Sequence, residues 1–361
     1  MKHVMPELYR GLTDEQLRAR ILKVKSDLGP RLVILTHHYQ CQEVVDLGDY
    51  GGDSFALSKK AAELKTAEFI VFCGVHFMAE SAAVLGRPEQ TVFIPDLAAG
   101  CPMAEMAPIE TVLRAEAELE RAVGPGAIVP VTYVNSSAAV KSFCGVNGGA
   151  CCTSSNADRV FAWAFRQRPK VLFLPDEHLG RNTAAKLDAG PAVLYDPQKP
   201  GGGLDPHQLR SARVILWKGF CHVHTNFTVE QIAEKRRELP GCLVVVHPEC
   251  RREVVAAADA SGSTEGIVKF VEAAPPGAVI VVGTEVHLVE RLQRRFAGAK
   301  TVVPLARSLC PNMYRINLHN LCWVLEAIAA GPEHWVNRVT VPAETRQGAR
   351  LALTRMLEIV G

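Results

Sequence analysis

The chain has 361 residues, of which 48% are hydrophobic, so it can bury a large core and is long enough for two or three domains. Its 40 basic and 38 acidic residues leave a net charge of +2, and no run of lysine and arginine indicates a nucleic-acid surface. No apolar run approaches the roughly 18 residues of a membrane span and the N-terminus is too charged for a signal peptide, so we expect a cytoplasmic protein with no membrane or nucleic-acid partner.

The predicted elements begin with an N-terminal helix. A capping box formed by Thr13 and Gln16 starts this helix, and Gly29-Pro30 ends it. From Arg31 onward, short apolar runs rich in β-branched residues alternate with helix-like stretches. This alternation is typical of an α/β protein with parallel sheets.

The strands and helices align as three copies of one pattern, at residues 31–103, 127–224 and 242–313. Each copy starts with a buried strand that ends in polar side chains: RLVILTHHYQ, AIVPVTYVNS and CLVVVHPECR. A Gly/Ser/Thr turn then opens a helix, and a second strand leads into another helix. A further strand ends each copy in a short turn and a cysteine.

The spacing within the copies supports this alignment. Gly74 precedes Cys101 by the same 27 residues by which Gly283 precedes Cys310, and the middle copy is longer because of a Gly/Pro-rich insertion at 188–206. We therefore predict three similar three-layer αβα domains, each with a mostly four-stranded parallel sheet, arranged with pseudo-threefold symmetry around a central site. The expected domains are 1–107, 108–221 and 222–310. Two more helices, at about 313–330 and 343–360, are expected to complete the first domain from the segment 311–361.

Only three of the eleven cysteines occupy the same place in every copy: Cys101, Cys221 and Cys310. Around a pseudo-threefold axis these thiols would converge. A four-iron four-sulfur cube has a threefold axis through one corner, so three thiolates can hold three irons and leave the fourth iron open as a Lewis acid. Two alternatives remain open, namely buried structural cysteines and a zinc ion with three cysteines and a histidine such as His224.

The other eight cysteines have no repeated position. Three lie in apolar surroundings and are expected in the core: Cys73, Cys242 and Cys322. Three cluster beside GVNGG, where they could form a redox pair or a second metal site: Cys144, Cys151 and Cys152. Two lie near the expected site loops: Cys41 and Cys250.

Polar side chains follow the first strand of each copy, where ligands bind in parallel sheets. They are His37, His38 and Tyr39; Tyr133, Asn135 and Ser136; and His247 and Glu249. Such groups transfer protons when burial shifts their pKa values. The helix openings GDS, TSSN and GST offer amides and hydroxyls for carboxylate or phosphate, although N-capping alone explains any one of them. The sequence contains no GxGxxG motif and no P-loop.

These segments together resemble the quinolinate synthase family of de novo NAD biosynthesis. The resemblance covers nearly the whole chain, through HHYQ, D-x-x-x-x-x-GDS, FCGVHFMAES, IPDLAAGCPMAEM, YVNSSAAVKS, TSSNA, KGFCHVH, HPEC, GST and LCPNMYRINLHNL. It implies condensation of iminoaspartate with dihydroxyacetone phosphate to quinolinate, with release of phosphate and two waters. It also implies one oxygen-sensitive [4Fe-4S] cluster and functional coupling to an enzyme that produces iminoaspartate.

The resemblance also implies roles for individual residues. The cluster ligands would be Cys101, Cys221 and Cys310. The substrate contacts would be His37, Ser54, Tyr133, Asn135, Ser154, His224, His247, Glu249 and Thr264. The catalytic residues would be Tyr39, Glu249, His37 and Tyr133, with Tyr39 and Glu249 moving protons. His38 and His222 stand where members vary, the 188–206 insertion resembles a longer subgroup, and the Cys144, Cys151, Cys152 cluster has no assigned role.

Two other functions remain open at this point. The first is another three-domain, three-cysteine cluster enzyme, such as the reductase that makes isoprenoid diphosphates or the diphthamide synthesis proteins, and a requirement for a stoichiometric electron donor would favour that reductase. The second is a non-catalytic iron-sulfur or zinc sensor of a small molecule, for which the sequence shows no DNA-binding or output module.

Overall fold

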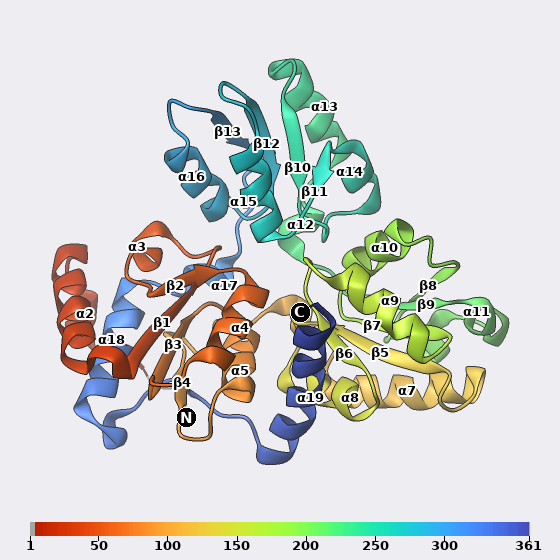
Figure 1. The fold of residues 1–361 in the computed structure, drawn as a ribbon, viewed down its shortest axis with the longest axis horizontal. Helices are drawn as coiled ribbons and strands as arrows, with labels where there is room; N and C mark the ends of the chain where they lie inside the picture. The colour runs from red at the N-terminus through yellow and green to blue at the C-terminus, as the bar shows by residue number, and fades with distance from the viewer. Residues whose placement is uncertain (1–3, 361) are drawn as a thin grey trace. The chain divides into compact units, whose positions relative to one another are not determined.

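Three β-sheets, each mainly parallel, form the framework of the protein (Figure 1). The structure, a computed structural model, describes residues 4–360. The chain divides into two compact units. The first unit extends to Cys101 and includes Leu309–Pro342, and the second comprises Pro102–Ser308 and the stretch from Ala343 onward. The predicted α/β class is confirmed.

The first unit contains a five-stranded sheet in the order β14-β4-β3-β1-β2. Its strands are β1 (Leu32–His37), β2 (Tyr50–Gly52), β3 (Phe69–Cys73), β4 (Thr91–Phe93) and β14 (Arg338–Val339). Neighbouring strands run parallel except β14, which pairs antiparallel with β4. Every residue of β1 and β3 is buried, as expected for parallel strands that are covered on both faces.

Helices at both ends of the sequence complete the first unit. They are α1 (Glu7–Arg10), α2 (Asp14–Leu28), α3 (Gln42–Val45), α4 (Ser54–Glu63), α5 (His76–Leu85), α17 (Pro311–Tyr314) and α18 (Leu318–Ala330), with 3-10 turns at Gly29–Arg31 and Pro332–His334. The predicted capping box is confirmed, because the Gln16 N–H donates to Oγ1 of Thr13 (3.3 Å) and the Thr13 N–H donates to Oε1 of Gln16 (2.9 Å). α18 packs beside α2, where Arg20 and Tyr9 both bind the Glu326 carboxylate (Figure 1).

The second unit contains two sheets, the first of which has the order β6-β5-β7-β9-β8. Its strands are β5 (Ile128–Tyr133), β6 (Ala150–Cys152), β7 (Lys170–Leu174), β8 (Ala192–Tyr195) and β9 (Val214–Trp217), all parallel to their neighbours. The helices of this region are α6 (Pro102–Glu105), α7 (Ile109–Val123), α8 (Ala138–Val146), α9 (Ala157–Gln167), α10 (Glu177–Lys186), α11 (Pro206–Ser211) and α19 (Ala343–Val360), with a 3-10 turn at Pro200–Gly203.

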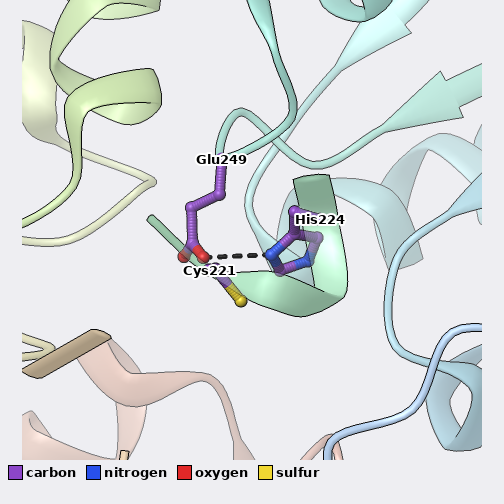
Figure 2. Close-up of side chains that lie close together, drawn as sticks. All are labelled: Cys221, His224 and Glu249. Carbon is purple, nitrogen blue, oxygen red and sulfur yellow. Dashed lines mark hydrogen bonds and ion pairs between the residues drawn. The ribbon is translucent and has the colours of Figure 1, made fainter. Parts of the chain in front are cut away.

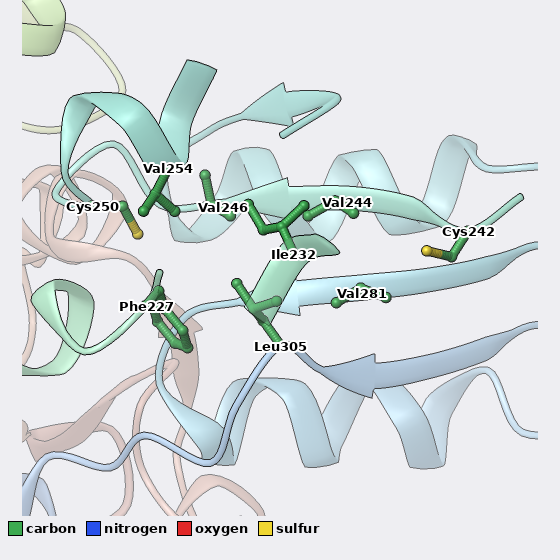
Figure 3. Close-up of a cluster of buried hydrophobic side chains, with 9 residues drawn as sticks. All are labelled: Phe227, Ile232, Cys242, Val244, Val246, Cys250, Val254, Val281 and Leu305. Atoms are coloured by element: carbon green, nitrogen blue, oxygen red, sulfur yellow. The ribbon is translucent and has the colours of Figure 1, made fainter. Parts of the chain in front are cut away.

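The other sheet of the second unit has four parallel strands in the order β11-β10-β12-β13. The strands are β10 (Leu243–Val246), β11 (Ala260–Ser261), β12 (Val279–Gly283) and β13 (Thr301–Pro304). The helices are α12 (His222–Thr225), α13 (Val229–Glu238), α14 (Arg252–Ala257), α15 (Thr264–Ala273) and α16 (Val286–Arg295). Figure 3 shows part of the core around this sheet, which includes Cys242, as expected, and also Cys250.

Two features differ from the expectation of four strands per sheet. The first sheet gains the two-residue strand β14, and the β5–β9 sheet gains β8 from the 188–206 insertion. Both added strands lie at sheet edges, where an extra strand can pair without disturbing the parallel core. The expected domain limits 1–107, 108–221 and 222–310 stay a prediction.

The last helix lies elsewhere than expected. α19 packs against α8 and β6 of the second unit rather than on the first domain (Figure 1). The two helices approach closely because a Cβ atom at Gly145 would collide with the backbone carbonyl of Gly348. Arg355 then donates to the carbonyl oxygens of Gly145 (2.8 Å) and Gly149 (2.7 Å). Packing of small residues, which hydrophobic patterning does not reveal, therefore decides where α19 docks.

Among residues 4–360, no helix combines the length and the apolar sequence that crossing a bilayer requires.

Gly145→Ala should destabilise the second unit by about 1–3 kcal/mol, because its methyl group overlaps the α19 backbone. Thermal unfolding followed by circular dichroism measures the loss. Gly266→Ala in α15 is the matched control, since a Cβ there meets only the Ser263 hydroxyl at 3.5 Å. That control should gain up to about 1 kcal/mol from helix propensity. Equal thermal midpoints for Gly145→Ala and the wild type would contradict the close packing.

Candidate functional site

A group of buried polar side chains lies at the carboxyl ends of strands in the second unit. Tyr133 ends β5, His224 lies in α12 after β9, and Glu249 lies in the loop after β10. All three are at most 5% exposed. Figure 2 shows His224 and Glu249 facing one another, with Cys221 beside them. Residues from the second and third sequence copies therefore meet at one place within the second unit.

Hydrogen bonds link these side chains into one network. The Tyr133 hydroxyl donates to Oε1 of Glu249 (2.6 Å), and Nδ1 of His224 contacts Oε2 of Glu249 (3.0 Å). The other ring nitrogen of His224 contacts Oγ1 of Thr284 (3.1 Å). The His247 ring stacks on His224 with 4.3 Å between centroids. Each carboxylate oxygen therefore has a partner, as a buried charge requires.

The charges of this network follow from burial and from these contacts. Burial, followed by the neighbouring His224, lowers the pKa of His247 to about 3, so His247 is neutral near pH 7. Burial acts to raise the pKa of Glu249, but His224, His247 and the hydrogen bond from Tyr133 outweigh it, so the net pKa is lowered and the carboxylate is ionised. An ionised carboxylate that contacts a phenol and an imidazole can accept and pass on a proton.

Asp176 is a second buried carboxyl group near Glu249, and the sequence did not single it out as a site residue. It is the N-cap of α10, where Oδ1 accepts from the Leu179 N–H (2.7 Å). Burial, and then the charge of Glu249, raises the pKa of Asp176 well above its ordinary value. Its sequence signal was its place after the buried strand β7, with one residue between, and Thr284 directly follows the buried strand β12.

The strand-end histidines of the first and third copies share one local geometry. Nδ1 of His37 accepts from the Tyr39 N–H (3.1 Å), and Nδ1 of His247 accepts from the Glu249 N–H (3.3 Å). An accepting Nδ1 places the ring proton on Nε2, so each neutral ring has Nε2–H as its donor. The correspondence supports the alignment of the copies, because it recurs in two sheets that belong to different units.

The predicted anion-binding hydroxyls lie at or just before helix openings, but they do not provide the N-caps. Ser54 and Thr264 are the first helical residues of α4 and α15, while Asp53 and Ser263 provide the side-chain caps. Ser154 lies in the turn before α9 rather than at the helix opening. The hydroxyls of Ser54 and Thr264 are therefore not used for capping, and N-capping alone does not explain them.

Asn135 lies just after Tyr133, and its Oδ1 atom is buried without a hydrogen-bond partner among residues 4–360. A buried polar atom that lacks a partner costs free energy unless a ligand or water satisfies it. Of the predicted site residues, the second unit thus holds Tyr133, Asn135, Ser154, Cys221, His224, His247, Glu249 and Thr264. The first unit holds His37, Tyr39, Ser54, Cys101 and Cys310.

The three repeated cysteines have equivalent surroundings. The first residues of α5, α10 and α16 each donate to the carbonyl two positions before a repeated cysteine, at 2.8 Å in all three cases. These pairs are His76 with Ala99, Glu177 with Gly219, and Val286 with Ser308. Cys101, Cys221 and Cys310 then each directly precede a one-turn helix, α6, α12 or α17. Their equivalence in the sequence therefore reflects one shared loop geometry.

Burial separates these cysteines from most of the others. Cys101, Cys221, Cys310 and Cys41 are partly exposed, and the remaining seven are buried. Among the described residues, the one group of three whose ligand atoms lie close enough to share a metal ion is Cys221, His224 and Glu249, within 4.8 Å of one another. Cys144, Cys151 and Cys152 are buried in the second unit, and burial raises their pKa values.

Comparison with known proteins gives a family match across most of the chain. Residues 19–358 match the family model described as quinolinate synthetase A protein. The chain is 50% identical to the quinolinate synthase of Acidobacterium capsulatum over 359 residues, which cover 98% of this chain and 95% of that protein. It is also 50% identical to the quinolinate synthase of Streptomyces coelicolor over 353 residues, covering 96% of this chain and 89% of that protein.

The lowered pKa of His247 predicts a pH-dependent stability. Below its ordinary value of 6.5 the unfolded chain binds a proton at this residue, whereas the folded chain does not until about pH 3. Stability should therefore fall as the pH drops through this window, by up to about 1.4 kcal/mol per pH unit. His247→Gln should lose less stability than the wild type between pH 6.5 and pH 4.5, as measured by thermal midpoints. The exposed His207→Gln is the control, and parallel slopes for all three proteins would contradict the prediction.

Proposed function

Because this chain belongs to the quinolinate synthase family, we propose that it condenses iminoaspartate with dihydroxyacetone phosphate to form quinolinate, releasing phosphate and two waters, in de novo NAD biosynthesis. In the structure, the observation that carries this proposal is the buried network of Tyr133, His224 and Glu249. Ring formation from these substrates needs repeated proton transfers, and this network combines an ionised carboxylate with two groups that exchange protons.

Glu249 is the proposed proton acceptor of the second unit. Each of its oxygens has one protein partner, which leaves lone pairs for a substrate proton. Tyr133 and His224 hold the carboxylate in one orientation, and Thr284 in turn orients His224. In the first unit, Tyr39 is the proposed second proton-transfer residue, and His37 donates from Nε2 because its Nδ1 accepts from the Tyr39 backbone.

The substrate groups match the donor types found at the predicted contact residues. Quinolinate carries two carboxylates and dihydroxyacetone phosphate carries a phosphate, and anions bind at helix N-termini. Ser54 and Thr264 would supply hydroxyls and backbone amides from the first turns of α4 and α15. Oδ1 of Asn135, which lacks a partner among residues 4–360, would accept a hydrogen bond from the substrate. Ser154, His224 and His247 complete the proposed contacts.

The cysteines fit a [4Fe-4S] cluster by donor type and by accessibility. Cys101, Cys221 and Cys310 offer thiolates from three equivalent loops, and they are among the four partly exposed cysteines. When bound by three cysteines, the cluster supplies a Lewis-acidic iron that assists loss of a substrate hydroxyl. The meeting of the three sulfurs around one cluster is part of this proposal. The zinc alternative would use Cys221, His224 and Glu249, and metal analysis separates the two.

The chemistry of the substrate also bears on partners and location. An imine hydrolyses in water, so we propose functional coupling to an enzyme that produces iminoaspartate. A cytoplasmic location is part of the same proposal, since a reducing compartment keeps the cysteine ligands as thiols.

The reaction from these substrates is redox-neutral, so quinolinate should form without an added reductant. An isoprenoid diphosphate reductase, in contrast, would require an electron donor.

Replacing Cys101, Cys221 or Cys310 by Ala should abolish the absorbance near roughly 400 nm that an iron-sulfur cluster gives the anaerobically purified protein. Iron and sulfide analysis should show the same loss. Cys41→Ala is the matched control, because Cys41 is the fourth partly exposed cysteine and should leave the cluster in place. Retention of the absorbance in all three single variants would refute the ligand assignment.

Glu249→Gln should keep the cluster absorbance but lower kcat for quinolinate formation by about 10²–10⁴-fold, because the amide keeps the shape of the side chain and cannot accept the proton. Turnover is measured anaerobically with both substrates and no reductant. The exposed Glu234→Gln on α13 serves as control and should match the wild type. Unchanged turnover in Glu249→Gln would remove Glu249 from the mechanism.

A further inference from the structure

We propose that Asn182 is a positioning residue for Glu249, acting through the backbone of the loop that carries this carboxylate; the inference rests on the function proposed above. Asn182 lies on α10, which follows β7 of the β5–β9 sheet. Its Nδ2 atom donates to the carbonyl of Pro248 (2.9 Å) and to the carbonyl of Cys250 (2.9 Å). One side-chain amide thus binds the carbonyl oxygens of the two residues that flank Glu249.

The loop after β10 needs this support because its own hydrogen bonds are few. Pro248 has no N–H group, and the Cys250 N–H turns back to the carbonyl of His247 (3.0 Å). The Glu249 N–H donates to Nδ1 of His247 (3.3 Å). These bonds join residues that are close in the sequence, and they do not involve the carbonyls of Pro248 and Cys250, which accept from Asn182. Without Asn182 these two carbonyls would lose that partner, and the loop could shift to find another.

α10 is a rigid base for this contact. Asp176, which is fully buried, caps its first turn, and the Glu177 N–H donates to the carbonyl of Gly219 (2.8 Å). Gly180 lets the helix pack directly on its sheet, because a Cβ there would collide with the side chains of Phe173 and Leu216. The amide of Asn182 is therefore held at a set distance from the β5–β9 sheet.

The same sheet also provides Tyr133, which donates to the Glu249 carboxylate. The β5–β9 sheet thus holds Glu249 at two points, the side chain through Tyr133 and the backbone through Asn182. Glu249 itself lies in the loop after β10 of the neighbouring four-stranded sheet, so its place relative to Tyr133 depends on contacts between two separate sheets. A displacement of about 1 Å in a reacting group can lower a rate by about 10²-fold, which makes such a link consequential for turnover.

Asn182→Ala should lower kcat by about 10- to 100-fold while KM for either substrate changes by less than about threefold, because the variant misplaces the proton acceptor and leaves the other proposed substrate contacts intact. Asn182→Asp removes the same two donors with almost no change in shape, so it should lower kcat at least tenfold as well. Asn147→Ala is the matched control, since this amide donates to a backbone carbonyl at the end of α8 (3.1 Å) and should leave kcat unchanged. Far-UV circular dichroism and the cluster absorbance should match the wild type in all three variants.

The decisive measurement repeats Asn182→Ala in the Glu249→Gln background. A residue that acts only through Glu249 has nothing left to position there, so the loss in kcat should shrink to less than about twofold. A loss that persists in full in the Glu249→Gln background, an unchanged kcat in Asn182→Ala, or loss of folding in both Asn182 variants would overturn the inference. If Glu249→Gln alone lowers kcat and Asn182→Ala does not, only this inference fails. If Glu249→Gln leaves kcat unchanged, the proposed role of Glu249 fails first.

Discussion

The buried charge of Glu249 is the constraint on which the arrangement of the second unit depends. A carboxylate removed from water is stable only where hydrogen bonds replace its solvation. Tyr133 and His224 supply these bonds, and they come from different segments, with Tyr133 at the end of β5 and His224 in the short helix after Cys221. The two sheets of this unit therefore have to present their strand ends to one point. The apolar strands form the cores, and the polar residues that follow them form the site.

The repeated architecture gives each part of the site an equivalent place in the chain. The hydrogen bond that precedes each of Cys101, Cys221 and Cys310 is the same in all three copies, and the histidine turn after the first strand recurs at His37 and His247. Departures from this equivalence are equally informative. The middle copy has Tyr133 near the end of its first strand, and it is this tyrosine that reaches across to the Glu249 of the third copy.

Burial assigns opposite roles to chemically similar groups. Glu249 and Asp176 are both buried carboxyl groups, but Glu249 has a phenol and an imidazole as partners, whereas Asp176 has mainly helix-capping bonds and faces the charge of Glu249. Their pKa values therefore move in opposite directions. Burial likewise raises the pKa values of the core thiols Cys152 and Cys250, whereas the three repeated cysteines lie in partly exposed loops.

The sequence by itself determined the α/β class, the three-copy pattern, the capping box at Thr13 and the candidate residues at the strand ends. All four features follow from local periodicity and from hydrogen bonds between residues close in the chain. Tertiary structure alone decided that Tyr133, His224 and Glu249 share one network, that Thr284 and Asp176 belong beside them, and that Asn182 binds the loop. It also decided that α19 docks on α8 through Gly145 and Gly348, and that β8 and β14 extend their sheets. These features depend on contacts between residues far apart in the chain, where the fit of surfaces and the partners of buried polar groups decide the outcome and local pattern carries no information.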